Sequence, residues 1–179
     1  VNQAKQVIIE LNTAMPAELE GFHDVYLPKR RPGRDPIPLT TVDQRLGSTA
    51  IAVDPERIVG IVLTESLDSP STGTPPDVET QAIAKHIVRF LENEVALGRL
   101  EKSLLPLQVG IGSIANAVTQ GLVESDFEEL TMYSEVLQDS AFHLLESGQL
   151  KFASASSITV TAPMMEHFFN HLDQFRDRV

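Results

Sequence analysis

The sequence predicts an α/β fold in which a mostly parallel, open sheet is flanked by helices. Short apolar segments typical of strands alternate with helical patterns at least three times along the chain. The 179 residues include 42% hydrophobic and 22% charged residues, which is the composition of a globular protein with an ordinary core. No repeat of roughly 20 to 50 residues interrupts this alternation.

The chain begins with a short strand and a long irregular passage. Residues 6–11 (QVIIEL) are apolar and rich in β-branched residues, which indicates a strand. Five prolines between residues 12 and 47 preclude a long helix there and predict an extended loop. This passage contains KRRPGR at 29–34, which we interpret either as a solvated linker or as a basic strip beside an anionic ligand.

A regular pattern starts at residue 57. RIVGIVLT (57–64) is an apolar run that predicts a strand buried on both faces. A helix is expected from Pro75, with Thr74 and Asp77 as a capping box, and it should end at Gly98. An apolar stripe at helical spacing is formed by Ile83, Ile87, Phe90, Leu91 and Leu97.

The remaining elements alternate in the order that the fold class requires. Strands are expected at 104–109 (LLPLQV), 130–136 (LTMYSEV) and 149–157, the last continuing into a loop. Helices are expected at 113–122, at 137–148 with Gly148 as the stop, and at 162–175 with Pro163 in the first turn.

Topology brings two distant motifs to one edge of this predicted sheet. The segments 104–109, 113–122 and 130–136 form a strand, a helix and a parallel strand, which is a right-handed crossover in nearly all proteins. Both strands then end at the edge where open α/β sheets bind ligands. The turn GIG (110–112) follows the first strand and Glu135 ends the second, so we expect them to lie close together.

Each motif has two interpretations when it is taken alone. The GIGS segment lacks the Lys-Ser/Thr of a P-loop, and as a dinucleotide fingerprint it is incomplete, with Ala115 in the third glycine position. It is either a tight turn without a ligand or bare backbone whose N–H groups stabilise an oxyanion. Glu135 is either a solvated surface residue or a partly buried, poorly solvated carboxylate that acts as a nucleophile.

Composition narrows the other possibilities. A net charge of −11 and a pI near 4.8 argue against nucleic-acid binding. The lack of cysteine excludes disulfides, thiolate zinc sites and cysteine nucleophiles, and it fits a reducing compartment. No apolar run is long enough for a membrane helix, and the start VNQAKQVIIELN is unlike a signal peptide. His167 and His171 stand four residues apart on a predicted helix, where we favour a structural role over a metal site.

Several segments together resemble the acetyl-CoA hydrolase/transferase family, the class I CoA-transferases that act on acetate, succinate and propionate. The resemblance is carried by VIIELN, PERIVGIVLTE, PPDVETQAIAKHIVRFLENEV, LLPLQVGIGSIANAV and LTMYSEVLQD, and it covers essentially the whole chain. It implies that residues 1–50 form the tail of an amino-terminal CoA-transferase domain with its linker. Residues 51–179 would then begin the second domain of a two-domain architecture. The family's later motifs, an asparagine and a G-G-x-x-D-F-type turn, do not occur here, so the chain resembles a middle piece.

The resemblance also implies a mechanism and site residues. Glu135 matches the family glutamate that attacks an acyl-CoA and then carries CoA as a glutamyl thioester. Ile111, flanked by Gly110 and Gly112, matches the residue whose N–H faces the oxyanion. Acyl-CoA and a small carboxylate are then the substrates, with no permanently bound cofactor and no metal. The full-length protein is expected to be a homodimer without nucleic-acid or membrane partners, in the cytoplasm or, in a eukaryote, the mitochondrion.

Three alternatives remain open from the sequence. Water could hydrolyse the same intermediate, which would make the protein an acyl-CoA hydrolase. The chain could instead be a non-catalytic α/β module that binds a nucleotide-like ligand or another chain. It could also be a degenerate structural subunit that needs a partner chain, and an isolated fragment of the enzyme is expected to be inactive.

Overall fold

The computed structural model describes residues 1–68, 70–71 and 75–179. The chain forms two compact units, one made of Val1–Thr40 and Gln44–Ser69 and the other of Thr41–Asp43 and Pro70–Val179. This division follows from contacts within the chain. The domain boundary at residue 50, which the family resemblance implies, is a different division and stays a prediction. None of the described helices combines the length and the apolar character needed to cross a lipid bilayer.

The first unit is built on two parallel strands, β1 (Val7–Asn12) and β2 (Ile58–Thr64), which pair along their whole lengths. The strands were predicted correctly, but the predicted burial of β2 on both faces is wrong in this structure. Ile61, Val62 and Leu63 expose 62%, 51% and 69% of their surface. The connection between the strands contains only two single-turn helices, Ala17–Leu19 and Pro55–Arg57, so the described residues of this unit include no helix long enough to cover either face.

The proline-rich connection is irregular, as its composition predicts, and side-chain contacts hold it. The Asp24 carboxylate accepts hydrogen bonds from the Leu46 and Gly47 N–H groups at 3.1 and 2.6 Å. A Cβ on Gly47 would lie 2.3 Å from the Val25 carbonyl, so only glycine fits this approach. The basic segment 29–34 is exposed, and Lys29 pairs with Asp35 at 2.6 Å. Both interpretations of that segment therefore remain open.

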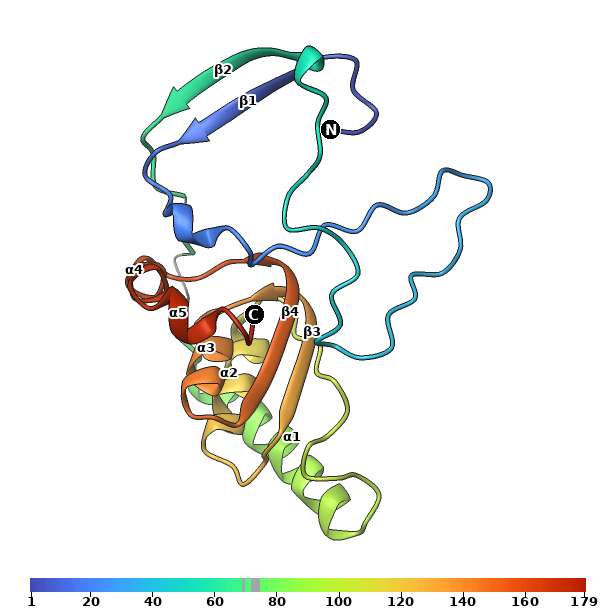
Figure 1. The fold of residues 1–179 in the computed structure, drawn as a ribbon. Coiled ribbons are helices and arrows are strands. Elements are labelled where there is room, and N and C mark those ends of the chain that lie inside the picture. Colours follow the sequence, from blue (N-terminus) through green and yellow to red (C-terminus); the bar gives the residue numbers. More distant parts are fainter. Residues whose placement is uncertain (69, 72–74) are drawn as a thin grey trace. The chain divides into compact units, whose positions relative to one another are not determined.

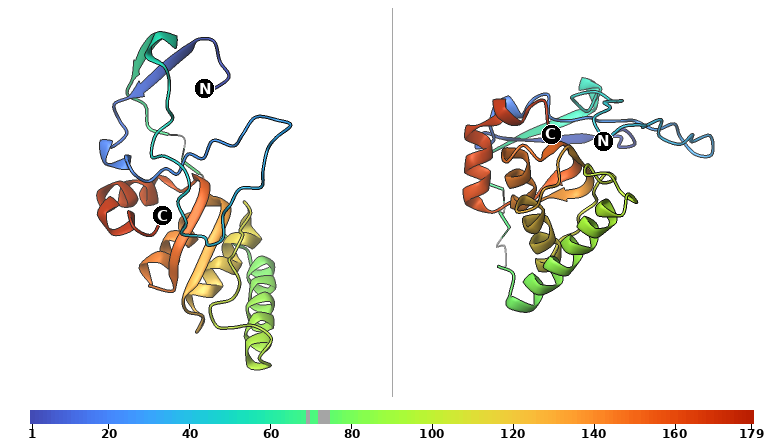
Figure 2. Two further views of the ribbon diagram at one scale, coloured as in Figure 1. Left: turned by 45° about the vertical axis from the view of Figure 1, so that its right-hand side comes forward. Right: turned by 90° about the horizontal axis from the view of Figure 1, so that it is seen from below.

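The second unit contains the predicted alternation of helices and parallel strands (Figure 1). Its elements are α1 (Val78–Ala96), α2 (Ser113–Val123), β3 (Leu130–Leu137), α3 (Asp139–Glu146), β4 (Leu150–Ile158), α4 (Ala162–Asn170) and α5 (Leu172–Phe175). The parallel strands β3 and β4 are joined through α3. Helices α2 and α3 pack against each other beside this pair, and α1 packs along α2 (Figure 2). The predicted α/β class with parallel strands and flanking helices is confirmed.

The core of the second unit lies between the β3–β4 pair and its helices. The side chains of Leu130, Met132 and Leu150 on the strands are fully buried. Phe142 of α3 is also fully buried, and its ring meets the rings of Phe168 and Phe175 at 5.2 and 5.4 Å in edge-to-face arrangements. Aromatic pairs of this geometry stabilise a core beyond the effect of area burial. Residues from β3 to α5 thus form much of the core of this unit, together with buried residues of α2 such as Leu122.

Helix α1 begins later than predicted. Its N-cap is Asp77, whose carboxylate accepts a hydrogen bond from the Thr80 N–H at 2.8 Å, and Pro75 precedes the helix. Thr74, the other member of the predicted capping box, lies outside the described residues. Gly98 follows the helix with φ of +69°, which is the expected stop.

The apolar stripe of α1 is only partly buried. Thr80 and Ala84 are the buried residues of the helix. Val88 comes so close to α2 that a Cβ on Gly121 would lie 3.0 Å from its methyl group. Phe90 of the predicted stripe is 59% exposed. The face of α1 that packs on α2 is therefore rotated from the stripe that hydrophobicity alone predicts.

The helix predicted over 162–175 is interrupted. His171, with φ of −133° and ψ of 30°, separates α4 from α5. Its Nδ1 lies 2.8 Å from the His167 carbonyl oxygen, and His167 Nε2 lies 2.5 Å from Glu146 Oε1. Within the described residues, no three His, Asp or Glu side chains are grouped as a metal site would require. Both histidines thus have contacts that order the end of this unit.

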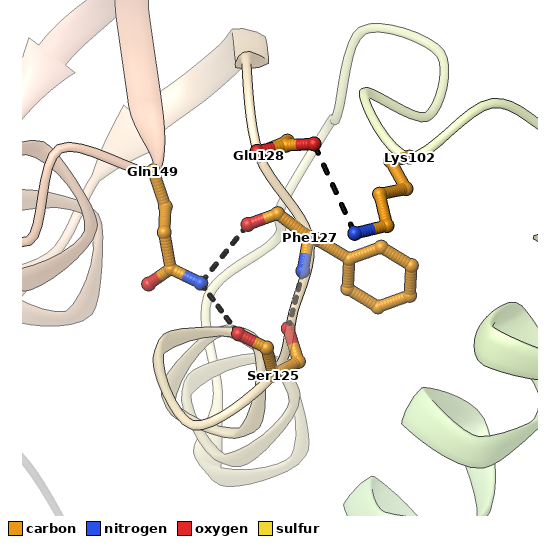
Figure 3. Close-up of polar contacts among 5 residues, drawn as sticks. All are labelled: Lys102, Ser125, Phe127, Glu128 and Gln149. Carbon is orange, nitrogen blue, oxygen red and sulfur yellow. Dashed lines mark hydrogen bonds and ion pairs between the residues drawn. The ribbon is translucent and has the colours of Figure 1, made fainter.

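One side chain fixes the corner between α2, β3 and β4 (Figure 3). The Gln149 amide nitrogen donates to the carbonyl oxygens of Leu122, Ser125 and Phe127 at 2.9, 2.9 and 3.1 Å. The Leu122 carbonyl belongs to the last turn of α2, where such groups lack helical partners. Beside this corner Lys102 lies 3.9 Å from Glu128, a weak exposed pair.

Candidate active site

The segment that precedes the GIG turn is not the regular strand that its apolar residues predict. Residues 104–109 form only a single parallel bridge, between Leu107 and Met132. Two local features explain this difference. Leu104 has φ of +53°, outside the strand region, and Pro106 has no N–H to donate to a ladder.

A serine hydroxyl continues the contact where main-chain pairing stops. The Leu107 N–H donates to the Thr131 carbonyl at 2.8 Å, and the Tyr133 N–H donates to the Leu107 carbonyl at 2.9 Å. Two residues further on, the Val109 N–H donates to Ser134 Oγ at 3.1 Å, and that hydroxyl donates to the Val109 carbonyl at 2.8 Å. Val109 directly precedes Gly110, and Ser134 directly precedes Glu135. The Val109–Ser134 hydrogen bonds thus connect the residues next to the glycine turn and next to Glu135, the two motifs that were predicted to lie close together.

The glycine turn (residues 110–112) leads directly into α2. Gly112 is the N-cap of the helix, with φ of +141° and ψ of 166°, a conformation that is essentially restricted to glycine. A Cβ on Gly110 would meet nothing within 4 Å. Conformation therefore explains Gly112, whereas contacts within the described chain do not explain Gly110. The side chain of Ile111 is 69% exposed.

The N–H groups of this turn are available for a ligand. Among the described residues, none accepts a hydrogen bond from the Ile111 N–H, and no side chain caps the start of α2. The first helical hydrogen bond runs from the Asn116 N–H to the Gly112 carbonyl at 3.0 Å. The N–H groups before it carry the partial positive charge of a helix start. They suit an anion or a developing oxyanion.

Glu135 lies near the carboxyl end of β3, as predicted, and of the two surroundings that the sequence left open, solvent exposure and partial burial, this structure has the first. The residue is exposed, and its carboxylate makes no hydrogen bond or ion pair with the described residues. Alternation along the strand places it on the same face as Tyr133, which is 49% exposed, and opposite to Met132 and Val136, which are buried. The Ser156 hydroxyl donates to the Glu135 carbonyl at 2.6 Å and holds its main chain to β4. The carboxylate is therefore accessible on the open face of the pair.

A pocket that sequence reasoning missed lies beside the start of α3. It has a volume of about 230 Å³, and its walls include Asn116, Gln138 and Asp139. Both oxygens of Asp139 are occupied by Thr161, which donates its N–H at 2.8 Å and its hydroxyl at 2.5 Å. The Gln138 side-chain oxygen is buried and has no hydrogen-bond partner among the described residues. Through these two hydrogen bonds, the Asp139 carboxylate at the start of α3 connects this wall of the pocket to Thr161, the N-cap of α4. No sequence motif marked it, because Asp139 lies 22 residues from Thr161.

Comparisons with known proteins support the resemblance. No family model matches the chain. The acetyl-CoA hydrolases of Kluyveromyces lactis and Saccharomyces cerevisiae are 46% and 44% identical to it over 179 residues, which is 100% of this chain and 34% of each of those proteins. The chain thus spans about a third of the length of these curated relatives.

Two solved structures show the fold. The crystal structure of RipA from Yersinia pestis has 18% identity and a TM-score of 0.54, over 94% of this chain and 32% of that one. The 4-hydroxybutyrate CoA-transferase of Porphyromonas gingivalis has 14% identity and a TM-score of 0.57, over 96% of this chain and 35% of that one. Over its whole length, the chain therefore corresponds to a segment of proteins of the acetyl-CoA hydrolase/transferase family, as its motifs predicted.

Proposed function

We propose that the polypeptide containing this chain transfers CoA from an acyl-CoA, such as acetyl-, succinyl- or propionyl-CoA, to a small carboxylate. Glu135 is the nucleophile, and the glycine turn supplies an oxyanion contact through the Ile111 N–H. The single observation that carries the proposal is the Val109–Ser134 link, which joins a free carboxylate on β3 to an unoccupied run of N–H groups. The identity with acetyl-CoA hydrolases supports the substrate class.

The chemistry follows from these two groups. The Glu135 carboxylate attacks the thioester carbonyl, the carbon–sulfur bond breaks, and CoA leaves as a thiolate with formation of a mixed anhydride. The thiolate attacks the glutamyl carbonyl and releases the first carboxylate, which leaves a glutamyl–CoA thioester. An acceptor carboxylate then takes CoA through the same steps in reverse. Each attack places negative charge on a carbonyl oxygen, which a preorganised N–H stabilises.

Hydrolysis of acyl-CoA is the second candidate, favoured by the names of the relatives. It shares the first steps and differs in that water attacks the glutamyl thioester, with release of CoA and restoration of the carboxylate. We propose the same site for both reactions. CoA is then a substrate, with no permanently bound cofactor, and the proposed full-length protein is a homodimer in the cytoplasm or, in a eukaryote, the mitochondrion.

Intact-protein mass after incubation with acetyl-CoA tests the covalent step. The longest polypeptide that contains this chain should gain the mass of CoA less one water, and Glu135→Ala should gain nothing. Glu128→Ala is the matched control, because this exposed glutamate stands just before the same strand with only a weak ion pair. An adduct on Glu135→Ala, or none on the parent while CoA binds, would overturn the mechanism and favour the non-catalytic binding module.

The fate of the adduct separates the two reactions. Decay only after addition of a carboxylate such as succinate or propionate indicates a transferase. Decay at the same rate in buffer indicates a hydrolase. The 179-residue chain is included because we expect the isolated segment to form no adduct.

A further inference from the structure

Ser134 makes a contact that regular strand pairing does not need. We propose that Ser134 is a positioning residue. Its hydroxyl fixes the position of the glycine turn along β3, so that the N–H groups of the turn can stabilise the oxyanion formed in the reaction of Glu135. This inference rests on the proposed function, because it concerns the same site. Ser134 does not itself touch the substrate, since alternation places its side chain on the face of β3 opposite to Glu135.

The hydroxyl replaces a pair of main-chain contacts. In a parallel pair, evenly spaced main-chain hydrogen bonds alternate between the strands. Such bonds join Leu107 to Thr131 and Tyr133. At Val109, one hydroxyl accepts from the N–H at 3.1 Å and donates to the carbonyl at 2.8 Å. Only serine or threonine offers both functions in so short a side chain.

The contact between the Ser134 hydroxyl and Val109 determines where the chain turns away from β3. The hydroxyl is the last contact between the segment 104–109 and β3 before Gly110, and Gly110 has space around it to change direction. Without the hydroxyl, the nearest hydrogen bonds between the segment and β3 are those of Leu107, three residues before Gly110. Removing it also leaves two main-chain groups without their partner in a partly buried place. The turn would then shift relative to Glu135.

The expected consequence is large for the reaction and small for stability. A misplacement of about 1 Å in catalytic geometry can lower a rate by about 100-fold. We therefore expect loss of the hydroxyl to slow formation of the CoA adduct by about 10- to 100-fold, with little change in KM for acyl-CoA. The effect should depend on the hydroxyl and not on side-chain volume.

Three variants of the longest polypeptide that contains this chain test the proposal. Ser134→Thr keeps the hydroxyl, Ser134→Val has the shape of threonine without the hydroxyl, and Ser134→Ala removes it with least added bulk. Ser154→Ala on β4 is the control, because this partly buried serine makes no side-chain hydrogen bond with the described residues. The readouts are the rate of adduct formation, KM, the thermal midpoint, and amide hydrogen exchange of residues 109–113.

The expected result is slow adduct formation and fast exchange at 109–113 in the Ala and Val variants, with the Thr variant and the control near the parent. Equal losses in Thr and Val, or rates that follow the thermal midpoint, would overturn the proposal. Unchanged exchange in the Ala and Val variants would overturn it as well. Hydrogen exchange needs no turnover, so a parent that forms no adduct contradicts the proposed function, while the exchange data still decide whether the hydroxyl holds the turn.

Discussion

Two pairs of parallel strands in this chain have similar apolar sequences but different surroundings. β3 and β4 have fully buried residues such as Met132 and Ala153, because α3 joins the strands and α2 packs beside it. β1 and β2 are joined by the proline-rich passage, and Ile61 and Leu63 stay exposed. Parallel sheets in proteins are normally covered on both faces. An apolar run therefore predicts a strand, but whether the strand is buried depends on which segments of the polypeptide cover it.

The largest expected effect concerns the interior of the second pair. Phe142→Ala removes a fully buried ring that meets two other phenylalanines, and it should lower the free energy of unfolding by about 3–5 kcal/mol. Urea unfolding followed by circular dichroism measures this loss. Phe90→Ala is the matched control, because Phe90 is 59% exposed and its truncation should cost much less. Similar losses at both positions would break the comparison.

An intermediate effect is expected in the first pair, and it depends on the length of the polypeptide. In the 179-residue chain, Leu63→Ser changes a side chain that is 69% exposed, so stability should change by no more than about 0.5 kcal/mol. In a polypeptide of the relatives' length, we expect a loss of about 2 kcal/mol or more, because further segments cover the pair. Thermal unfolding of both forms measures the difference.

Val62→Ser serves as the companion variant, because residues 62 and 63 point to opposite faces of β2. Loss at only one position would identify the covered face. No loss at either position in the longer polypeptide would show that the exposed pair is a property of the whole protein.

The smallest expected effect concerns the second unit, at the start of α1, which packs along α2. Hydrogen bonds from the Thr80 hydroxyl and N–H hold the pKa of Asp77 below its ordinary value of 3.8. A lowered pKa in the folded state means that the charged cap stabilises the helix above pH 3.8 and that this contribution fades as pH falls through the folded value. Asp77→Asn keeps an acceptor without the charge.

Thermal midpoints of the parent and Asp77→Asn, measured from about pH 6 downward, test this small contribution through their difference. The parent should be slightly more stable at the higher pH, and the two curves should converge below pH 3.8. Parallel curves would show that the Asp77 charge contributes nothing to the cap.

The sequence was sufficient for the elements whose signals are local. Gly98 and Gly148 end helices with positive φ, and the alternation of strands and helices identified the fold class. The segment 104–109 was predicted incorrectly, because its apolar letters resemble a strand whereas Leu104 and Pro106 do not fit a ladder. The interruption at His171 was also missed, since no glycine or proline marks it.

For the candidate site, the sequence predicted which two motifs lie at the same edge of the fold. The segment 104–109 runs parallel to β3 with a single bridge, which brings the glycine turn and Glu135 to one edge, and the Val109–Ser134 contact links them. The exposure of Glu135 was not predictable, because it depends on which segments cover the open face. The bridging role of Ser134 depends on a contact across 25 residues, for which the sequence contains no local signal.

The Gln149 amide has a consequence for how this chain tolerates insertions. Residues 124–129 form the loop between α2 and β3, and surface loops are the usual place for insertions, although Phe127 in this loop is buried. Yet three carbonyl groups around this loop converge on one side-chain nitrogen. A longer loop would have to give up that shared donor, so its permissible lengths are limited by Gln149, which stands directly before β4. The passage between β1 and β2 carries a similar constraint, because one guanidinium nitrogen of Arg45 donates to the Gly21, Phe22 and His23 carbonyl oxygens at 3.1, 3.4 and 3.4 Å, so extra residues there also fit only away from such a shared donor.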